Sequence, residues 1–148
     1  MKQKIDPISE GEQAWIATQL VNASGFVAAF SAQDAEATIS LTALDRAFAA
    51  WMGSGTTDDA ESTNKIINSV GVAFGRFLVE GLGLRWVIAT DEHGSDLAVY
   101  GLPGTGDILL YPTNFIAKRW ESQETNFIEE SYRQIERQVR SIERQFRQ

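Results

Sequence analysis

The chain of 148 residues is long enough to bury an ordinary hydrophobic core and is expected to form one domain. Because it contains no cysteine, disulfides, thiolate nucleophiles, zinc ribbons and iron–sulfur clusters are excluded, and a reducing, cytoplasmic location is predicted. The net charge is −7, and residues 1–100 carry 13 acidic against 6 basic side chains, which argues against a nucleic-acid partner.

The apolar runs of the sequence are all far shorter than the ~20 residues of a membrane-spanning helix. The N-terminal sequence MKQKIDPISEGEQ has no apolar segment behind its lysines, so a secretory signal is not predicted either. We expect a protein that does not associate with membranes.

The first half of the chain, about residues 9–81, is predicted to be helical after a frayed start at 1–6. Ser9 and Glu12 have the spacing of a capping box, and Gly25 is expected to interrupt the helix that they open. Apolar residues recur at helical spacing over 40–52, which predicts a second helix that ends at the Gly/Ser/Thr loop 53–57.

A third helix is predicted to run from Asp58 and Asp59, acids suited to a helix N-terminus, to about residue 80. Gly71 and Gly75 within it are four residues apart. This spacing indicates close packing against a neighbouring element of the same domain, which we favour over helix dimerisation. Gly81 is expected to end the helix.

Residues 84–111 are predicted to form a three-stranded antiparallel meander. Its strands are expected at 85–90, 95–101 and 107–110, because apolar residues alternate there between two rather apolar faces. A four-residue connection, 91–94, joins the first two strands and places Gly94 where a positive φ is needed. The second turn contains Gly101, Gly104 and Gly106, which lack the order of a phosphate-binding loop.

The C-terminal part, about 112–147, is predicted to hold a short helix that begins at Pro112 and a long helix over 125–147. The apolar seam of the long helix consists of Ile128, Tyr132, Ile135, Val139, Ile142 and Phe146. It can pack on its own domain or pair with a second copy of the chain, and the sequence leaves both open. Its arginines at 133, 137, 140, 144 and 147 alternate with glutamates, which favours a solvated face over nucleic-acid or membrane contact. The predicted fold is a single α+β domain over 1–148: a three-stranded meander packed against several helices, with a long C-terminal helix.

His93, the one histidine of the chain, is predicted to lie in an exposed turn. A single histidine makes a poor zinc site, and the neighbouring acids lack the spacing of a calcium loop. The chain also has no G-x-S-x-G elbow for a serine nucleophile. We therefore predict no catalytic residues, no metal site and no cofactor.

Four charged residues form the candidate ligand-binding set: Arg85, Asp96, Lys118 and Arg119. By strand alternation Asp96 is expected to be partly buried and to pair with Lys118 or Arg119, since a buried carboxylate needs a partner. Structural pairing is favoured over binding of a ligand. The residues expected to shape the turn, strand and helix starts are Trp86, Asp91, Glu92, Gly94, Asp96 and Pro112.

The segment from about 83 to 135 resembles a bacterial family of uncharacterised domains, the domain of unknown function numbered 3806. The resemblance rests on Trp86-Val87, on the run Asp91-Glu92-His93-Gly94-Ser95-Asp96, on Pro112 and on Ile116-Ala117-Lys118-Arg119. The resemblance implies a bacterial origin and no assigned activity, so no catalytic residue is carried over from it.

The absence of recognisable catalytic groups favours a non-enzymatic protein-binding domain, and we expect no enzyme activity. By analogy with immunity proteins, such an acidic protein could neutralise a basic partner. The alternative is a small-ligand-binding domain or a carboxylate-based enzyme that uses Asp96 and Lys118. A homodimer through the C-terminal helix is a third option.

Overall fold

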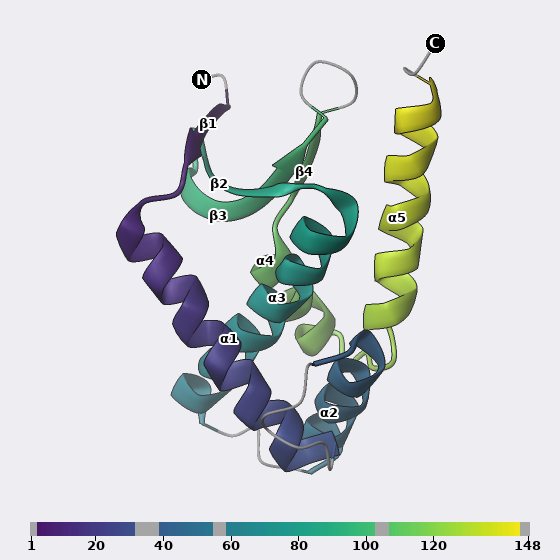
Figure 1. Cartoon of the computed structure of the whole chain (residues 1–148). Coiled ribbons are helices and arrows are strands. Elements are labelled where there is room, and N and C mark those ends of the chain that lie inside the picture. Colours follow the sequence, from purple (N-terminus) through teal and green to yellow (C-terminus); the bar gives the residue numbers. More distant parts are fainter. Residues whose placement is uncertain (1–2, 32–38, 55–58, 103–106, 146–148) are drawn as a thin grey trace.

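A computed structural model describes residues 3–31, 39–54, 59–102 and 107–145 as an antiparallel sheet at one end of a group of helices (Figure 1). The helices are α1 (Glu10–Ser31), α2 (Leu41–Gly53), α3 (Ala60–Leu82), α4 (Pro112–Glu121) and α5 (Ile128–Gln145). The strands are β1 (Lys4–Pro7), β2 (Arg85–Asp91), β3 (Gly94–Gly101) and β4 (Ile108–Leu110), in the order β1-β2-β3-β4. The α+β class and the long C-terminal helix are confirmed.

The predicted number of three strands is wrong, because segment 4–7 pairs with β2 as a fourth strand. Ile5 lies opposite Ala89, and Pro7 lies opposite Val87. A four-residue strand that contains a proline has no detectable alternation, but proline is tolerated at a sheet edge. Segment 4–7 is therefore a strand because it pairs with β2, and not because of its own sequence preference.

Helix α1 also departs from prediction, because it continues through Gly25 to Ser31. A glycine inside a helix costs only about 1 kcal/mol, while Ala23, Phe26 and Val27 around it are buried in the core. Their burial keeps the segment helical.

Helix ends and turns follow local chemistry. The Ser40 hydroxyl accepts a hydrogen bond from Ala43 N at the start of α2 (3.0 Å), and Asp59 accepts one from Glu61 N at the start of α3 (3.1 Å). Helix α3 ends at Leu82, about two residues later than predicted, and Gly83 in place of Gly81 is its left-handed cap. The hairpin connection is shorter than predicted, because Asp91 pairs with Gly94 across a two-residue turn. The predicted positive φ of Gly94 is confirmed at 127°.

Several predicted features lie outside the described residues: Asp58, the loop 55–57, Gly104 and Gly106, and the helix end with Phe146 and Arg147.

The main core lies between the helices and the inner face of the sheet. A chain of aromatic side chains links α1, α2, α3 and α4 through neighbouring ring contacts, in the order Phe26, Trp51, Phe48, Phe127, Phe115 and Phe74. On the other face of the sheet Val87, Ala89 and Ala98 form a second buried cluster, against which side chains of the sheet itself and Tyr111 pack.

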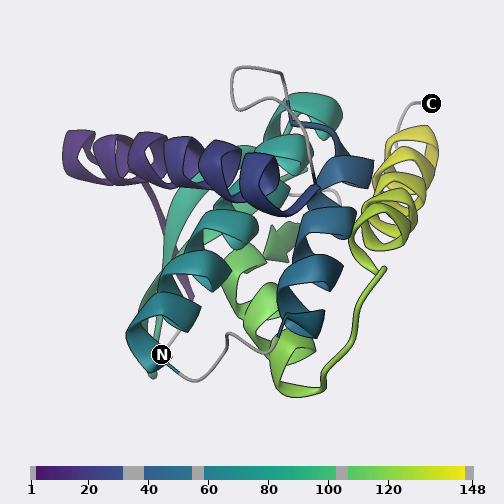
Figure 2. The ribbon, with the colours of Figure 1, turned by 90° about the horizontal axis from the view of Figure 1, so that it is seen from below.

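Seen from below, α1 crosses one side of the helix group, and α5 stands at another edge beside α2 (Figure 2). Three members of the apolar seam of α5 are buried in the single chain: Ile128, Tyr132 and Val139. Three of the five described seam residues therefore pack within their own domain, while Ile135 and Ile142 remain half-buried. In the described part of the chain, no helix is both long and apolar enough to cross a membrane.

Candidate functional site

A cleft of about 270 Å³ lies where β4 passes into α4, and α5 borders it. β4 ends at Leu110 and α4 begins at once with Pro112, whose fixed φ suits the first turn of a helix. This abrupt strand-to-helix turn brings residues of β4 and of the first two turns of α4 into one wall. The cleft is lined by Phe74, Leu109, Leu110, Tyr111, Pro112, Asn114, Phe115, Lys118 and Ile135.

The walls of this cleft are mainly apolar, and its polar groups lie on Tyr111, Asn114 and Lys118. No side chain caps the N-terminus of α4, so no capping side chain offsets the positive end of the helix dipole there. Lys118 is exposed and has no ion-pair partner in the described part of the chain. The cleft is therefore an apolar hollow whose lining contains one cationic side chain, Lys118.

The neighbouring Arg119 is engaged elsewhere. Its guanidinium lies 4.6 Å from the centre of the Phe115 ring, and its Nε lies 3.5 Å from Glu124 Oε2. Arg119 thus covers a core aromatic ring and does not line the cleft.

Arg85 and Asp96 lie on the outer face of the sheet, since Arg85 pairs with Tyr100, and Asp96 with Ala89. The Arg85 guanidinium is 5.5 Å from the centre of the Tyr100 ring. Asp96 is exposed, so its predicted burial is wrong. Its face of the sheet is covered over Ala89 and Ala98, whereas Asp96 lies next to the turn at the open end of the hairpin.

The predicted pairing of Asp96 with Lys118 or Arg119 does not occur among the ion pairs of the described residues. Tyr111 connects the two regions, because it lines the cleft with Lys118 while its hydroxyl feels the charge of Asp96. Burial, and then the carboxylates of Asp91 and Asp96, raise the pKa of Tyr111. The Tyr111 hydroxyl accepts a hydrogen bond from Gln3 Nε2 at 2.9 Å.

The residues singled out as shaping the hairpin and the turns lie at such positions. Asp91 Oδ1 accepts a hydrogen bond from His93 N at 2.7 Å, which braces the turn. His93 is exposed at the tip, with Nε2 3.5 Å from Glu92 Oε1. Trp86 packs beneath the sheet against Gly75 of α3. No group of three or more potential metal ligands occurs within the described residues.

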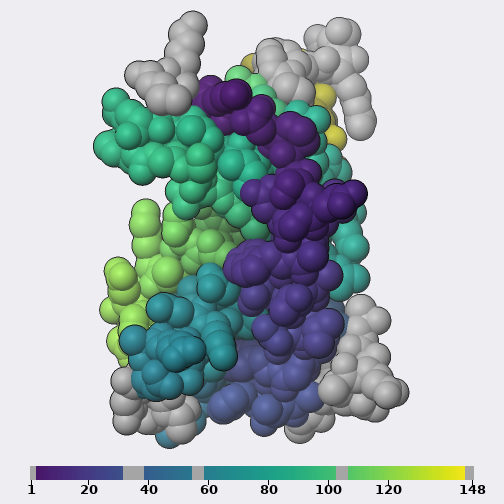
Figure 3. Space-filling view, turned by 90° about the vertical axis from the view of Figure 1, so that its left-hand side faces the viewer, coloured from purple at the N-terminus to yellow at the C-terminus, as the bar shows by residue number. Residues whose placement is uncertain are grey.

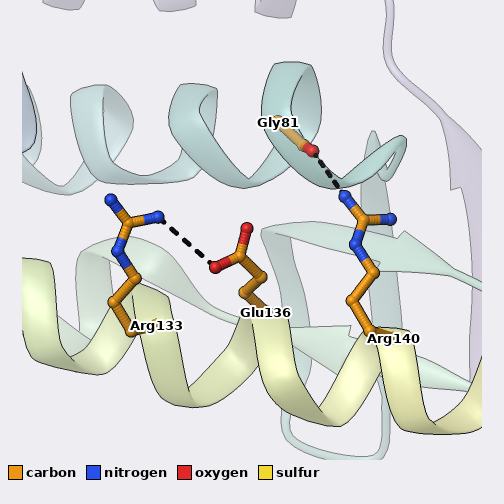
Figure 4. Close-up of polar contacts among 4 residues, drawn as sticks. All are labelled: Gly81, Arg133, Glu136 and Arg140. Atoms are coloured by element: carbon orange, nitrogen blue, oxygen red, sulfur yellow. Dashed lines mark hydrogen bonds and ion pairs between the residues drawn. The ribbon is translucent and has the colours of Figure 1, made fainter.

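The arginines of α5 make ion pairs along their own helix, as the sequence indicates. Arg133 Nη1 lies 3.3 Å from Glu136 Oε1, and Arg140 Nη1 lies 2.9 Å from Glu143 Oε1. Figure 4 shows that Arg140 also reaches α3, where Nη2 donates to the Gly81 carbonyl at 3.3 Å. A cation at the C-terminus of α3 complements the helix dipole, so these charges anchor α5 to α3.

Sequence reasoning identified Lys118 but missed Tyr111 and Asn114 as members of the same hollow. The available signal was the sequence Tyr111-Pro112, because a strand followed directly by a helix-starting proline places both elements around one corner. Ile135 was identified only as a member of the α5 seam. Its position opposite α4 depends on how α5 packs, which the sequence does not specify.

A comparison with protein families finds one match: the model of a domain of unknown function, DUF3806, matches residues 49–132. This is more than half of the chain, so the protein belongs to that family, and the resemblance seen in the sequence is confirmed. The match begins earlier than the resemblance did and includes α3. No curated protein and no solved structure matches the chain.

Proposed function

We propose that this DUF3806 protein is a non-enzymatic protein-interaction domain whose β4–α4–α5 cleft receives an apolar side chain of a partner polypeptide. The observation that carries the proposal is the cleft itself, an apolar hollow of about 270 Å³ with an unpaired lysine at its rim, within the described residues. All of its lining residues except Ile135 fall within the family match.

The size of the cleft favours an anchor residue over a cofactor. Sites for cofactors and drug-sized molecules typically occupy about 300–1,000 Å³ and enclose most of the ligand. A volume of about 270 Å³ lies at the lower end of that range and suits one or two apolar side chains. Energetically important interface residues characteristically insert large side chains into such desolvated pockets.

The charge of the cleft indicates what lies next to that side chain in the partner. Lys118 and the uncapped N-terminus of α4 both attract a negative group. The partner segment therefore carries a carboxylate, from Asp, Glu or a chain terminus, beside its apolar residue.

The composition of the cleft supports a binding role without catalysis. None of its lining residues is a carboxylate or a histidine, so the lining offers no paired general acid and base. The alternative with Asp96 and Lys118 in one active site gains no support, since Asp96 lines a different hollow.

Two further parts of the proposal rest on the sequence. The bacterial cytoplasm suits a chain without cysteine whose family resemblance is bacterial. Self-association through α5 would have to use Ile135 and Ile142, because the rest of the described seam is buried within the chain.

The test is selection of binders from a random dodecapeptide phage library, followed by fluorescence anisotropy of the selected peptides. We expect peptides with a large apolar residue beside an acidic one. Lys118→Glu should weaken their binding at least tenfold, a loss of about 1.4 kcal/mol.

The matched control is Lys65→Glu, which reverses an exposed lysine that does not line the cleft. This variant should bind as the parent protein does. Equal weakening by both variants would reduce the effect to net charge, and failure to select any apolar–acidic peptide would overturn the proposal.

A further inference from the structure

A second hollow, separate from the β4–α4–α5 cleft, lies between the start of α1 and the β2–β3 hairpin. Figure 3 shows the face of the molecule on which α1 and the sheet adjoin. This hollow has a volume of about 270 Å³ and is lined by Gly11, Glu12, Trp15, Ile88, Ser95, Asp96 and Leu97.

Trp15 is the unusual residue of this hollow. Its side chain is 40% exposed. Among the described residues, Val21 is the only other large hydrophobic residue that is exposed. Tryptophan is the residue type most enriched in binding hot spots, because it offers a large rigid surface. A half-exposed tryptophan beside a hollow is therefore a candidate contact residue.

The apolar wall opposite Trp15 comes from the inner face of the hairpin. Ile88 and Leu97 are cross-strand partners and are both half-buried. Near the hairpin end these residues are less deeply buried than Val99, which packs in the main core. The hollow thus has an aromatic face and an aliphatic face that are both reachable from solvent.

Glu12 supplies the charge of this hollow, because Asp96 borders it from β3 but belongs to the outer face of the sheet. Glu12 is held in place, because its Oε1 accepts a hydrogen bond from Ser9 N and Ser9 Oγ accepts one from Glu12 N at 3.2 Å. This reciprocal capping box fixes the carboxylate beside the first turn of α1. No lining residue is basic, and the first 100 residues carry an excess of acids.

We propose that this hollow binds a lysine or arginine side chain of a protein partner, with the cation over the Trp15 ring and near the Glu12 carboxylate. Cations are attracted to the face of tryptophan more than to any other aromatic side chain, and their alkyl stems pack on apolar surface. The aliphatic wall of Ile88 and Leu97 would accommodate that stem. This site goes beyond the proposed function, since its charge is opposite to that of the Lys118 cleft.

The experiment is a titration of the ¹⁵N-labelled protein with hexaarginine amide, followed through the tryptophan indole signals in NMR spectra. Trp15→Phe identifies the Trp15 signal. We expect this signal to shift saturably, with little change at the signals of the other tryptophans. A neutral Gly-Ser hexapeptide should leave all of them in place.

Two matched variants separate specific binding from diffuse attraction. Glu12→Gln removes the charge but keeps an amide oxygen able to make the capping-box hydrogen bond, so α1 should remain intact. Glu10→Gln removes the same charge two residues earlier, at a residue that does not line the hollow.

We expect Glu12→Gln to weaken hexaarginine binding at least fivefold and Glu10→Gln to weaken it less than twofold. Equal weakening by both variants, or no shift of the Trp15 signal at millimolar peptide, would overturn the proposal. Lys118→Glu should leave this titration unchanged, so that the result is independent of the β4–α4–α5 cleft.

Discussion

Helices α4 and α5 both pack against α3, but they approach it in different ways. Where α4 lies, α3 presents glycines: a Cβ on Gly71 would lie 2.6 Å from the Thr113 Cα, and one on Gly75 would overlap the Trp86 ring. Real Cβ atoms do not come that close to other heavy atoms. The backbone of α4 therefore rests directly on α3, and the interface is closed.

Helix α5 is held at a greater distance by long side chains. Arg140 reaches the Gly81 carbonyl, and the Tyr132 hydroxyl touches Gly81. At its N-terminus, α5 is fixed to α2, because the Asp45 carboxylate accepts hydrogen bonds from Ile128 N and Glu129 N, both at 2.8 Å. Between these attachments Ile135 borders the cleft. The comparison teaches that backbone contact leaves no gap at Gly71, whereas the side-chain contacts of α5 leave a cleft between α5 and α4.

The largest effect is expected from breaking the closed interface with Gly71→Ala. The added methyl would force the α4 backbone away, and overpacking of this kind costs about 1–3 kcal/mol, more than the helix propensity of alanine returns. The measurement is the urea midpoint of unfolding. Gly25→Ala is the control, since a Cβ there meets nothing within 4 Å and should raise stability by up to ~1 kcal/mol. If both substitutions stabilise the protein, the closed α3–α4 interface is not as tight as described.

A smaller effect is expected from loosening the attachment of α5 with Asp45→Ala. Loss of a carboxylate that caps a helix N-terminus costs about 0.5–2 kcal/mol, so the urea midpoint should fall. Asp45→Asn keeps one of the two oxygen acceptors and should lose less. If alanine and asparagine lose equally, hydrogen bonding to the N-terminus of α5 is not what Asp45 contributes.

The closed interface could be predicted from the sequence far better than the open one. The spacing of Gly71 and Gly75 predicts a closely packed neighbouring element, because glycine inside an amphipathic helix usually reflects close packing. No pattern in the sequence around Asp45 predicts its capping role, because the helix that it caps begins more than 80 positions away. The same limitation applies to β1, whose residues become a strand only through pairing with β2.

The residues of the candidate site also differ in how well the sequence predicts their surroundings. Lys118 was singled out as an expected partner of a buried Asp96, and the structure places it in the lining of the β4–α4–α5 cleft. Its expected partner Asp96 was assigned from strand alternation, which gave the correct face but not the depth. Burial depends on which side chains pack on that face, and the cluster around Ala89 and Ala98 leaves Asp96 exposed. Periodicity thus predicts orientation, whereas exposure is a property of the assembled fold.

The smallest expected effect concerns the α3–α5 interface, at the contact of Tyr132 with Gly81. Burial, and then the Glu136 carboxylate, raise the pKa of Tyr132 above its ordinary value of 10.0. A raised pKa means that the folded protein binds the phenolic proton more tightly than the unfolded chain does. The resulting stabilisation is complete below about pH 10 and is lost as pH rises through the folded-state pKa.

Tyr132→Phe keeps the ring and removes this titration, while Tyr100 and Tyr111, whose pKa values are also raised, remain as a common background. Between about pH 8 and about pH 11 the urea midpoint of the parent protein should therefore fall further than that of Tyr132→Phe. Parallel curves would mean that the Tyr132 hydroxyl is as well solvated in the folded protein as in the unfolded chain. In that case α5 would lie further from α3 near Tyr132 than the contact with Gly81 implies. The open interface would then extend along the whole of α5.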